Sequence, residues 1–260
     1  MRIIDKIKAD GVHISFEVFP PKTDAGFESV LKATDGIAEL NPSFISVTYG
    51  AGGGTSKNTV KIASHIKNDL KIPALAHLTC VSSTKEEVHK VIGQLQEAGI
   101  ENILALRGDI PQDGQFPLPG QYSHASELIE DIKKTGDFCI GAACYPEGHV
   151  EMEHKKDDIR YLKEKVDCGV DFITTQMFFD NDIFYNFLYR IREQRIMVPV
   201  LPGIMPITTK KQLARSCALS GTAVPQRFRA IVDYFGDDPA AMKQAGIAYA
   251  TDQIIDLIAN

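Results

Sequence analysis

Short apolar runs alternate with longer amphipathic stretches along the chain. The apolar runs are rich in β-branched residues, which is typical of strands. Between them, apolar side chains recur with the period of one helix face, as in residues 27–40, 88–95 and 183–191. Strands are predicted to begin, at intervals of 27 to 36 residues, near His13, Phe44, Pro73, Asn102, Phe138, Asp171 and Val198. The pattern therefore predicts a repeated strand–helix unit.

Capping residues mark the ends of several predicted helices. Thr55-Ser56 and Ser82-Ser83-Thr84 stand where N-caps belong, and Glu86-Glu87 follows the second group. Glycine is favoured just beyond the end of a helix, and the predicted helices stop at Gly99, Gly136, Gly169 and Gly221.

Strands that are separated by helices pair in parallel sheets, which predicts the α/β class. A regular repeat over about 250 residues favours a (β/α)8 TIM barrel over an open doubly wound sheet. The open sheet stays an alternative, although a G-x-G-x-x-G turn is missing after the first strand. Gly50-Ala51-Gly52-Gly53-Gly54 comes near that pattern, but Thr55 occupies the last glycine position. No linker interrupts the chain, so we expect one domain over residues 1–260.

Composition narrows the class of protein. The chain is 44% hydrophobic and 24% charged, which excludes a disordered tail, a collagen and a disulfide miniprotein. No apolar stretch approaches the ~18 residues of a membrane span, and the N-terminus lacks the apolar core of a signal peptide. A net charge of −6 with mixed signs argues against nucleic acid as a partner.

Cysteine usage points to a reducing cytoplasm. The chain has five cysteines and no C-x-x-C pair, so we expect neither disulfides nor a metal site. We expect all five to behave as small buried hydrophobes.

Polar residues collect where the predicted strands end, which is where barrel enzymes place their chemistry. In the first strand, period two puts Ser15, Glu17 and Phe19 on one face. The other face, with Ile14, Phe16 and Val18, is predicted to pack against helices. Glu17 is therefore predicted to point into the barrel, although burying a lone carboxylate is costly.

Five further strands end in hydrogen-bonding or titratable residues, namely Thr48-Tyr49, His77-Leu78-Thr79, Arg107-Gly108-Asp109, Tyr145-Pro146-Glu147 with His149, and Thr174-Thr175-Gln176. Each of these residues could instead have a purely structural role. Arg107 and Asp109, for example, could simply form an ion pair with each other. Together they favour a small-molecule site with one carboxyl for acid catalysis. An Arg-Gly-Asp turn, aromatic faces and histidines suit a large, flat, partly anionic cofactor rather than a metal.

At these residues the chain resembles the methylenetetrahydrofolate reductase family. The matching strings occur in the family's order and spacing over residues 13–250. They are Ser15-Phe16-Glu17-Val18-Phe19-Pro20-Pro21, Val47-Thr48-Tyr49-Gly50-Ala51-Gly52-Gly53, His77-Leu78-Thr79-Cys80, Leu106-Arg107-Gly108-Asp109, Tyr145-Pro146-Glu147-Gly148-His149, Thr175-Gln176-Met177-Phe178-Phe179-Asp180 and Pro202-Gly203-Ile204-Met205-Pro206.

The resemblance implies a flavin-dependent barrel of one-carbon metabolism. Such enzymes reduce 5,10-methylenetetrahydrofolate to 5-methyltetrahydrofolate in a ping-pong scheme, with NADH or NADPH reducing bound FAD first, and so supply methyl groups for methionine synthesis. The family forms homodimers or homotetramers.

The resemblance also implies roles for single residues. Glu17 matches the general acid, and Asp109 matches an aspartate beside flavin and pterin, so both are expected to be catalytic and to contact the substrate. Gln176 and Gln212 match further substrate contacts. The positions that match FAD contacts are Thr48, Tyr49, Ala51, His77, Arg107, Gly108, Asp109, Ala125, Tyr145, His149, Asp158 and Lys165. To hold a proton near neutrality, Glu17 needs a raised pKa, which an apolar barrel mouth near Phe16, Phe19 and Pro20 would supply.

The sequence departs from the family's pattern at several points. Tyr161 and Glu164 replace an asparagine and an arginine found in some relatives, and Ser216 replaces a bulky residue. The chain ends at Asn260, after a helix predicted over Ala248–Ile258. With seven strands predicted, we expect the eighth strand and a folate-tail arginine to be missing, which is typical of a truncated chain.

Three other functions stay open on the sequence. One is a proline dehydrogenase-like flavoenzyme. Another is a barrel lyase acting on phosphorylated substrates, although Pro202-Gly203-Ile204-Met205-Pro206 is too proline-rich for a phosphate loop. The third is a non-catalytic flavin- or folate-binding fragment.

Overall fold

The computed structural model describes residues 1–21, 26–49, 56–81, 83–110, 116–152 and 154–260. Ala51 and the rest of the glycine-rich run Gly50–Gly54 lie outside these ranges, as does Thr55. The chain divides into two units, and each is described by itself. The first holds residues 1–142 and 165–172, and the second holds residues 143–164 and 173–260.

Parallel strands form the centre of the first unit. Each strand pairs with the next along the chain, and the register places Glu17 opposite Ser46 and His77 opposite Leu104. The strands are β1 (Ser15–Val18), β2 (Phe44–Val47), β3 (Ala74–Thr79), β4 (Asn102–Leu106) and β5 (Cys139–Cys144), the last of which continues into the second unit.

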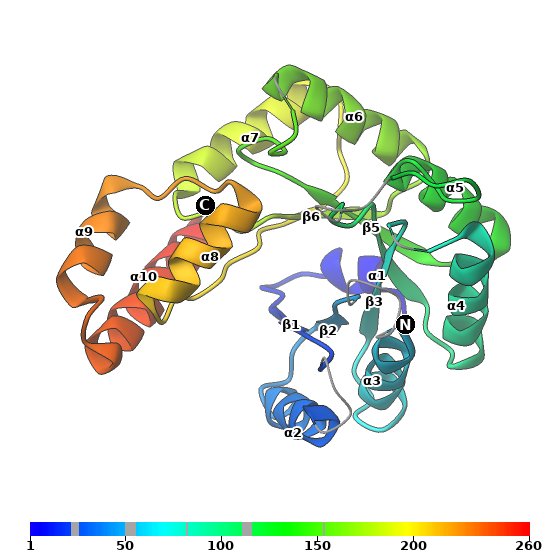
Figure 1. The fold of residues 1–260 in the computed structure, drawn as a ribbon, viewed down its shortest axis with the longest axis horizontal. Coiled ribbons are helices and arrows are strands. Elements are labelled where there is room, and N and C mark those ends of the chain that lie inside the picture. The colour runs from blue at the N-terminus through cyan, green and yellow to red at the C-terminus, as the bar shows by residue number, and fades with distance from the viewer. Residues whose placement is uncertain (22–25, 50–55, 82, 111–115, 153) are drawn as a thin grey trace. The chain divides into compact units, whose positions relative to one another are not determined.

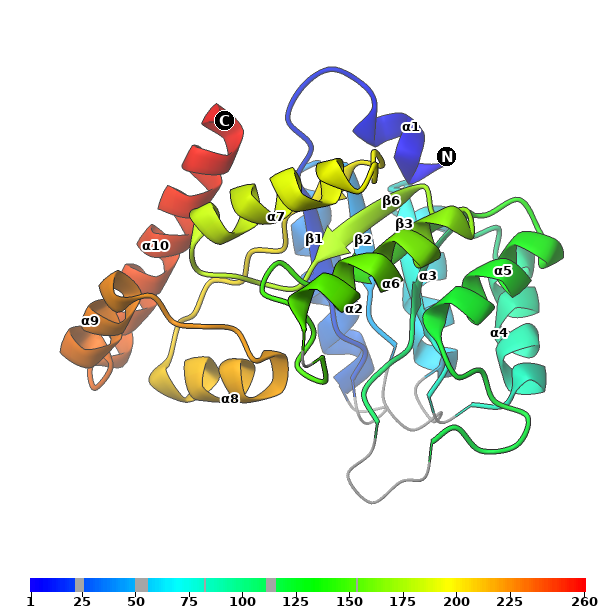
Figure 2. The same ribbon diagram turned by 90° about the horizontal axis from the view of Figure 1, so that it is seen from above.

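Helices cover the outer face of these strands (Figures 1 and 2). They are α2 (Phe27–Ala38), α3 (Ser56–Asn68), α4 (Lys85–Glu97) and α5 (Ala125–Thr135). The short helix α1 (Ile3–Ile7) is tied to the start of β4, where the Asn102 side chain accepts a hydrogen bond from the Ile3 N–H at 2.8 Å. The helix α6 (Lys155–Asp167) is shared between the two units.

The inner face of the first unit is closely packed. Gly141 on β5 stands opposite Leu104. A Cβ added to Gly141 would lie 2.7 Å from the Phe172 ring and 2.9 Å from Leu104. Because such distances are well inside van der Waals contact, only glycine fits there.

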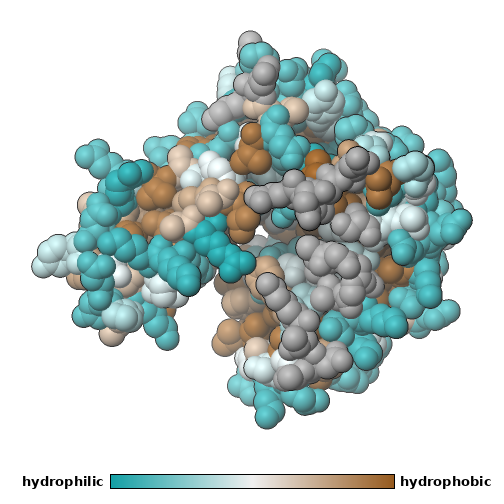
Figure 3. Space-filling view, viewed as in Figure 1, coloured by the Kyte–Doolittle hydropathy of each residue, from teal (hydrophilic) through white to brown (hydrophobic). Residues whose placement is uncertain are grey.

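The second unit combines a parallel strand pair with four helices. The strands are β6 (Phe172–Thr175, whose first residue belongs to the first unit) and β7 (Val200–Leu201). The helices are α7 (Asn181–Glu193), α8 (Lys210–Ser220), α9 (Gln226–Phe235) and α10 (Pro239–Ala259). An apolar core joins Met177, Phe179, Ile207, Leu213, Phe228, Val232 and Met242. Hydrophobic surface also shows among the polar side chains over α8 and α9 (Figure 3).

The structure confirms the α/β class of barrel type. Seven strands alternate with helices in the described ranges, and each begins within two residues of its predicted start. Thr84 makes the expected capping box with Glu87. Gly99, Gly169 and Gly221 have positive φ, whereas Gly136 ends α5 in an extended conformation.

Two predictions about packing were wrong. Ile14 precedes β1 instead of packing against helices, and 52% of it is exposed. Of the five cysteines, Cys80, Cys139 and Cys144 are buried, but Cys168 and Cys217 are partly exposed because they lie at or near the ends of helices.

No helix in the described part of the chain is both long enough and apolar enough to cross a lipid bilayer.

Candidate functional site

Glu17 lies on β1 with its carboxylate turned toward the neighbouring strands. Its Oε2 atom is 3.5 Å from the Ser46 hydroxyl, which donates to it, and 3.4 Å from Nε2 of His77. Period two along each strand places these three side chains on one face of the sheet. The predicted inward direction of Glu17 is therefore confirmed, and its contact with His77 is a finding of the structure.

The surroundings of Glu17 favour its protonated form. Burial raises the pKa of the carboxyl, and the hydrogen bond from Ser46 opposes this by stabilising the anion. The side chain is nevertheless 46% exposed. Packed strands crowd the carboxyl on one side while the other side stays open, so the group can hold a proton and exchange it with a ligand or with water.

His77 is the buried member of this group. Its side chain is only 7% exposed, and burial lowers its pKa to about 3. The imidazole is therefore neutral near pH 7, and its contact with Glu17 is not an ion pair. The Nε2 atom has no hydrogen-bond partner among the described residues.

The Arg107-Gly108-Asp109 turn continues β4 and is fixed to the end of β3. The Arg107 carbonyl accepts hydrogen bonds from the N–H groups of Cys80 at 3.1 Å and Val81 at 2.9 Å. Gly108 has φ +88°, and a Cβ there would lie 3.2 Å from Cβ of Thr79. The positive φ therefore favours glycine, and a Cβ would in addition press closely on Thr79.

The two charged side chains of this turn, Arg107 and Asp109, differ in their contacts and exposure. The Nε atom of Arg107 donates to the Gly108 carbonyl at 3.3 Å, and the Asp109 side chain is exposed. Two further predicted cofactor contacts, Thr48 and Tyr49, directly follow β2. Ala125 is buried at the first residue of α5.

In the second unit, Tyr145 and His149 lie together. Their rings meet edge to face with centroids 4.7 Å apart. The Nδ1 atom of His149 accepts a hydrogen bond from the Glu151 N–H at 3.2 Å. The neutral ring therefore carries its proton on Nε2, which makes that nitrogen a donor.

Gln176 follows β6 and is held close to the end of β5. Its N–H donates to the Cys144 carbonyl at 2.8 Å, and its Oε1 accepts from the Met177 N–H at 2.9 Å. Gln176 shares a small pocket with Tyr145, Pro146, Glu147, Gly148, Met177, Ser220 and Thr222. The structure thus brings two predicted ligand contacts, Tyr145 and Gln176, to one pocket.

The remaining predicted residues are in helices. Asp158 and Lys165 are half-buried and lie two turns apart on α6. The Gln212 side chain caps the start of α8, where its Oε1 accepts from the Thr208 N–H at 2.9 Å and its Nε2 donates to the Pro206 carbonyl at 3.3 Å. This cap could have been predicted from the sequence, because Thr209 and Gln212 have the spacing of a capping box.

Sequence reasoning missed Ser46, the hydrogen-bond donor to Glu17. The residue stands two positions before Thr48 on β2, so its face of the strand could have been predicted from period two.

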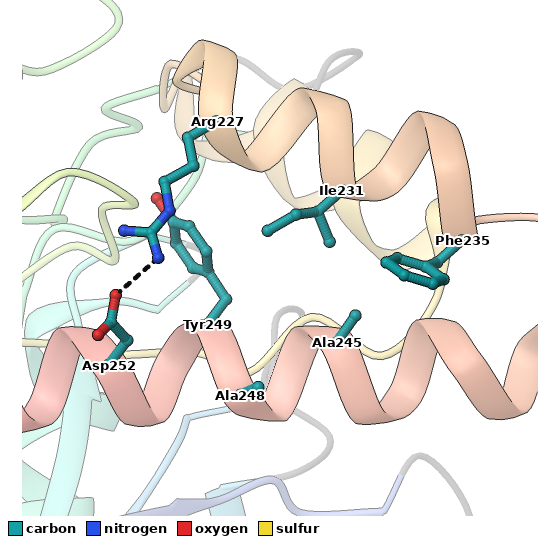
Figure 4. A pocket seen from close by; sticks show the side chains of 7 residues that line it. All are labelled: Arg227, Ile231, Phe235, Ala245, Ala248, Tyr249 and Asp252. Atoms are coloured by element: carbon teal, nitrogen blue, oxygen red, sulfur yellow. Dashed lines mark ion pairs between the residues drawn. The ribbon is translucent and has the colours of Figure 1, made fainter.

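A second pocket lies between α9 and α10 and contains none of the predicted site residues (Figure 4). Arg227 pairs with Asp252 at 3.0 Å and lies over the Tyr249 ring. Ile231, Phe235, Ala245 and Ala248 complete the lining.

Comparison with known proteins identifies the family. The sequence model of the family described as methylenetetrahydrofolate reductase matches residues 2–260. The chain belongs to this family.

Curated relatives fall into two length classes. The methylenetetrahydrofolate reductase (NADH) 1 of Arabidopsis thaliana is 36% identical over all of this chain, which spans 47% of the plant protein. The 5,10-methylenetetrahydrofolate reductase of Escherichia coli is 34% identical over 94% of this chain and 81% of the bacterial protein. The chain therefore spans about half the length of its plant relatives and most of its bacterial ones.

Solved structures share the fold at low identity. A protein from Clostridium thermocellum, described as binding two copies of 5-methyl-5,6,7,8-tetrahydrofolic acid, has a TM-score of 0.59 at 15% identity, covering 96% of this chain and 86% of its own. A 2,3-dimethylmalate lyase has a TM-score of 0.54 at 12% identity, covering 98% of this chain and 83% of its own.

Proposed function

We propose that the protein reduces 5,10-methylenetetrahydrofolate to 5-methyltetrahydrofolate with FAD as cofactor and NADH or NADPH as reductant. The observation that carries the proposal is Glu17. In a chain of this family, the first strand presents a carboxyl whose pKa is raised by burial and whose side chain is 46% exposed. This is what a general acid that works near neutral pH needs.

Glu17 would donate its proton to the amine nitrogen that leaves as the five-membered ring of the substrate opens. The hydrogen bond from Ser46 would then stabilise the carboxylate. The exposed side of the carboxyl would allow it to regain a proton before the next turnover. Asp109, Gln176 and Gln212 are proposed to contact the substrate, and the Gln212 side chain would first have to leave Thr208.

The polar groups of the described residues fit a flavin nucleotide. Arg107 offers a guanidinium for anionic oxygens, and Gly108 lets the backbone come close to a ligand. In the second unit, His149 offers Nε2 as a donor beside the Tyr145 ring. Bound FAD would supply the hydride. The other residues proposed to hold it are Thr48, Tyr49, Ala51, His77, Asp109, Ala125, Asp158 and Lys165.

The wider setting follows from the same assignment. We propose a ping-pong scheme in which both half-reactions use one site, and a cytoplasmic homodimer or homotetramer. None of the five cysteines forms a disulfide in the structure, which suits a reducing compartment. The plant relatives are named for NADH, so we expect NADH to be accepted.

Three observations on the purified chain test this function. The protein should be yellow with FAD, should bleach anaerobically with NADH or NADPH, and should regain its colour with methylenetetrahydrofolate. A protein that takes up no FAD would contradict the proposal and favour another barrel enzyme. A protein that bleaches but is not reoxidised by the folate would favour a non-catalytic binding fragment.

A further inference from the structure

A buried nitrogen without a hydrogen bond stands next to the proposed acid. The Nε2 atom of His77 has no hydrogen-bond partner in the described ranges, although the side chain is only 7% exposed. Leaving a buried polar atom unpaired costs about as much as losing a hydrogen bond, so native proteins rarely do it without a function. Its polar neighbour is Oε2 of Glu17, at 3.4 Å.

Two kinds of hydrogen bond could join these atoms, and they have opposite effects on the protonation of Glu17. A protonated Nε2 would donate to an ionised carboxylate, forming a charge-assisted bond of about 2.7–2.9 Å that favours the anion. The observed separation of 3.4 Å is longer than either bond, but burial favours the acid form of Glu17 and the neutral form of His77, which excludes a bond between two charged groups. The alternative is that an unprotonated Nε2 accepts a hydrogen bond from the acid form of Glu17.

Among the described residues, no charged group shifts the pKa of either side chain. The influences on the pKa of Glu17 are burial and the Ser46 hydroxyl, and the only influence on His77 is burial. The Ser46 hydroxyl lies 3.5 Å from both the Glu17 carboxyl and the Phe16 carbonyl, so its single hydrogen serves one of them at a time. His77, by contrast, has a buried nitrogen with no hydrogen bond among the described residues, so it is the acceptor that gains a partner from Glu17.

We infer that His77 is a positioning residue, whose Nε2 accepts the hydrogen bond of the protonated Glu17 carboxyl. A small rotation of the Glu17 side chain closes the gap of 3.4 Å to a hydrogen bond. The imidazole then fixes the acid in one orientation and holds its proton until a substrate nitrogen replaces Nε2 as acceptor. The role in catalysis rests on the proposed function, whereas the hydrogen bond itself does not.

Nitrogen NMR of the full chain, with ¹⁵N-labelled histidine, tests the hydrogen bond without any activity measurement. The His77 resonances are assigned by their loss in His77→Gln. At a pH where Glu17 is protonated, Nε2 should carry no proton, and its resonance should move away from the hydrogen-bonded range in Glu17→Ala. Glu17→Gln, whose amide can donate, should restore most of the original shift.

Two NMR results would overturn the inference. One is a protonated Nε2, which would make His77 a donor. The other is a resonance that Glu17→Ala leaves unchanged but that moves when FAD is added, which would make His77 a cofactor contact only. Both results are read on proteins that keep His77 in place, and His77→Gln serves only to assign the resonances.

Kinetics test the positioning role. His77→Leu, which has no acceptor, should slow the folate half-reaction at least tenfold more than the nicotinamide half-reaction, with the effect in kcat rather than KM. His77→Gln keeps an acceptor oxygen and should recover most of that loss. Equal rates for Leu and Gln would contradict positioning through this bond. If the wild-type chain reduces no folate at all, the proposed function fails, while the NMR result still decides the hydrogen bond.

Discussion

The buried imidazole of His77 should make the protein lose stability in mild acid. Its pKa is about 3 in the folded chain, against about 6.5 for an unperturbed histidine. Below pH 6.5 the unfolded chain binds a proton at this position and the folded chain does not. Protonation therefore favours unfolding, and the stability present above pH 6.5 is lost progressively as the pH falls toward 3.

The size of the effect follows from the two pKa values. Each pH unit between them costs about 1.4 kcal/mol, because that is the free energy of a tenfold change in proton binding. Lowering the pH from 7 to 5 crosses about 1.5 of these units, so His77 alone should cost the wild-type protein about 2 kcal/mol. For a protein with ordinary stability, this is a large fraction of the total.

Urea unfolding at pH 7 and pH 5 checks this number, with His77→Gln as the test variant. The free-energy advantage of wild type over the variant should shrink by about 2 kcal/mol at the lower pH. His154→Gln, which removes an exposed imidazole, controls for the loss of one histidine elsewhere. An advantage for wild type that is the same at both pH values would refute a buried neutral His77.

Three other predictions concern packing and charge. The ring nitrogens of His65 lie 2.8 Å from carboxylate oxygens of Asp35 and Asp69. Burial lowers the pKa of His65, but the hydrogen bonds to the two carboxylates outweigh it and raise the pKa. The stability that this contact provides is therefore present below pH 6.5 and is lost as the pH rises through the pKa of His65 in the folded protein. His65→Gln should therefore destabilise more at pH 6 than at pH 8 in urea unfolding, and the opposite order would count against the contact. Gly108→Ala should lower the free energy of unfolding by about 1–3 kcal/mol, because Gly108 has a positive φ. Gly93→Ala is the control, since its Cβ would meet no neighbouring group within 4 Å and alanine should stabilise α4 slightly. Thermal unfolding of both variants measures the two effects. Gly246→Ala should fail to fold or lose more than about 3 kcal/mol of its free energy of unfolding, since the added Cβ would lie 1.7 Å from the Ile207 carbonyl oxygen. Near-normal stability of this variant in the same assay would mean that α10 packs differently.

The sequence predicted the fold well because its signals are local. Alternating apolar runs and caps such as Thr84 with Glu87 depend on a few neighbouring residues, and the strands begin close to where these signals placed them. The exposure of Ile14 was not predictable in this way. It depends on where pairing with the next strand begins, which is a tertiary property.

The sequence predicted the direction of the Glu17 side chain but not the contacts that it makes. Period two placed Glu17 on the inner face, and the contact with His77 agrees. The hydrogen bond from Ser46 depends on the register of β1 against β2, which the sequence alone does not specify. Gln212 shows the reverse case, because a residue matched to a ligand contact also has the spacing of a helix cap.

Glu17→Gln tests the central claim most directly. The amide keeps the size of the side chain but cannot donate the proton that opens the substrate ring. Stopped-flow absorbance, with FAD bound, measures flavin reduction by NADH or NADPH and flavin reoxidation by methylenetetrahydrofolate separately. The account predicts that Glu17→Gln keeps the first reaction and loses the second. Equal loss in both reactions, or folate reduction at the wild-type rate, would contradict Glu17 as the acid.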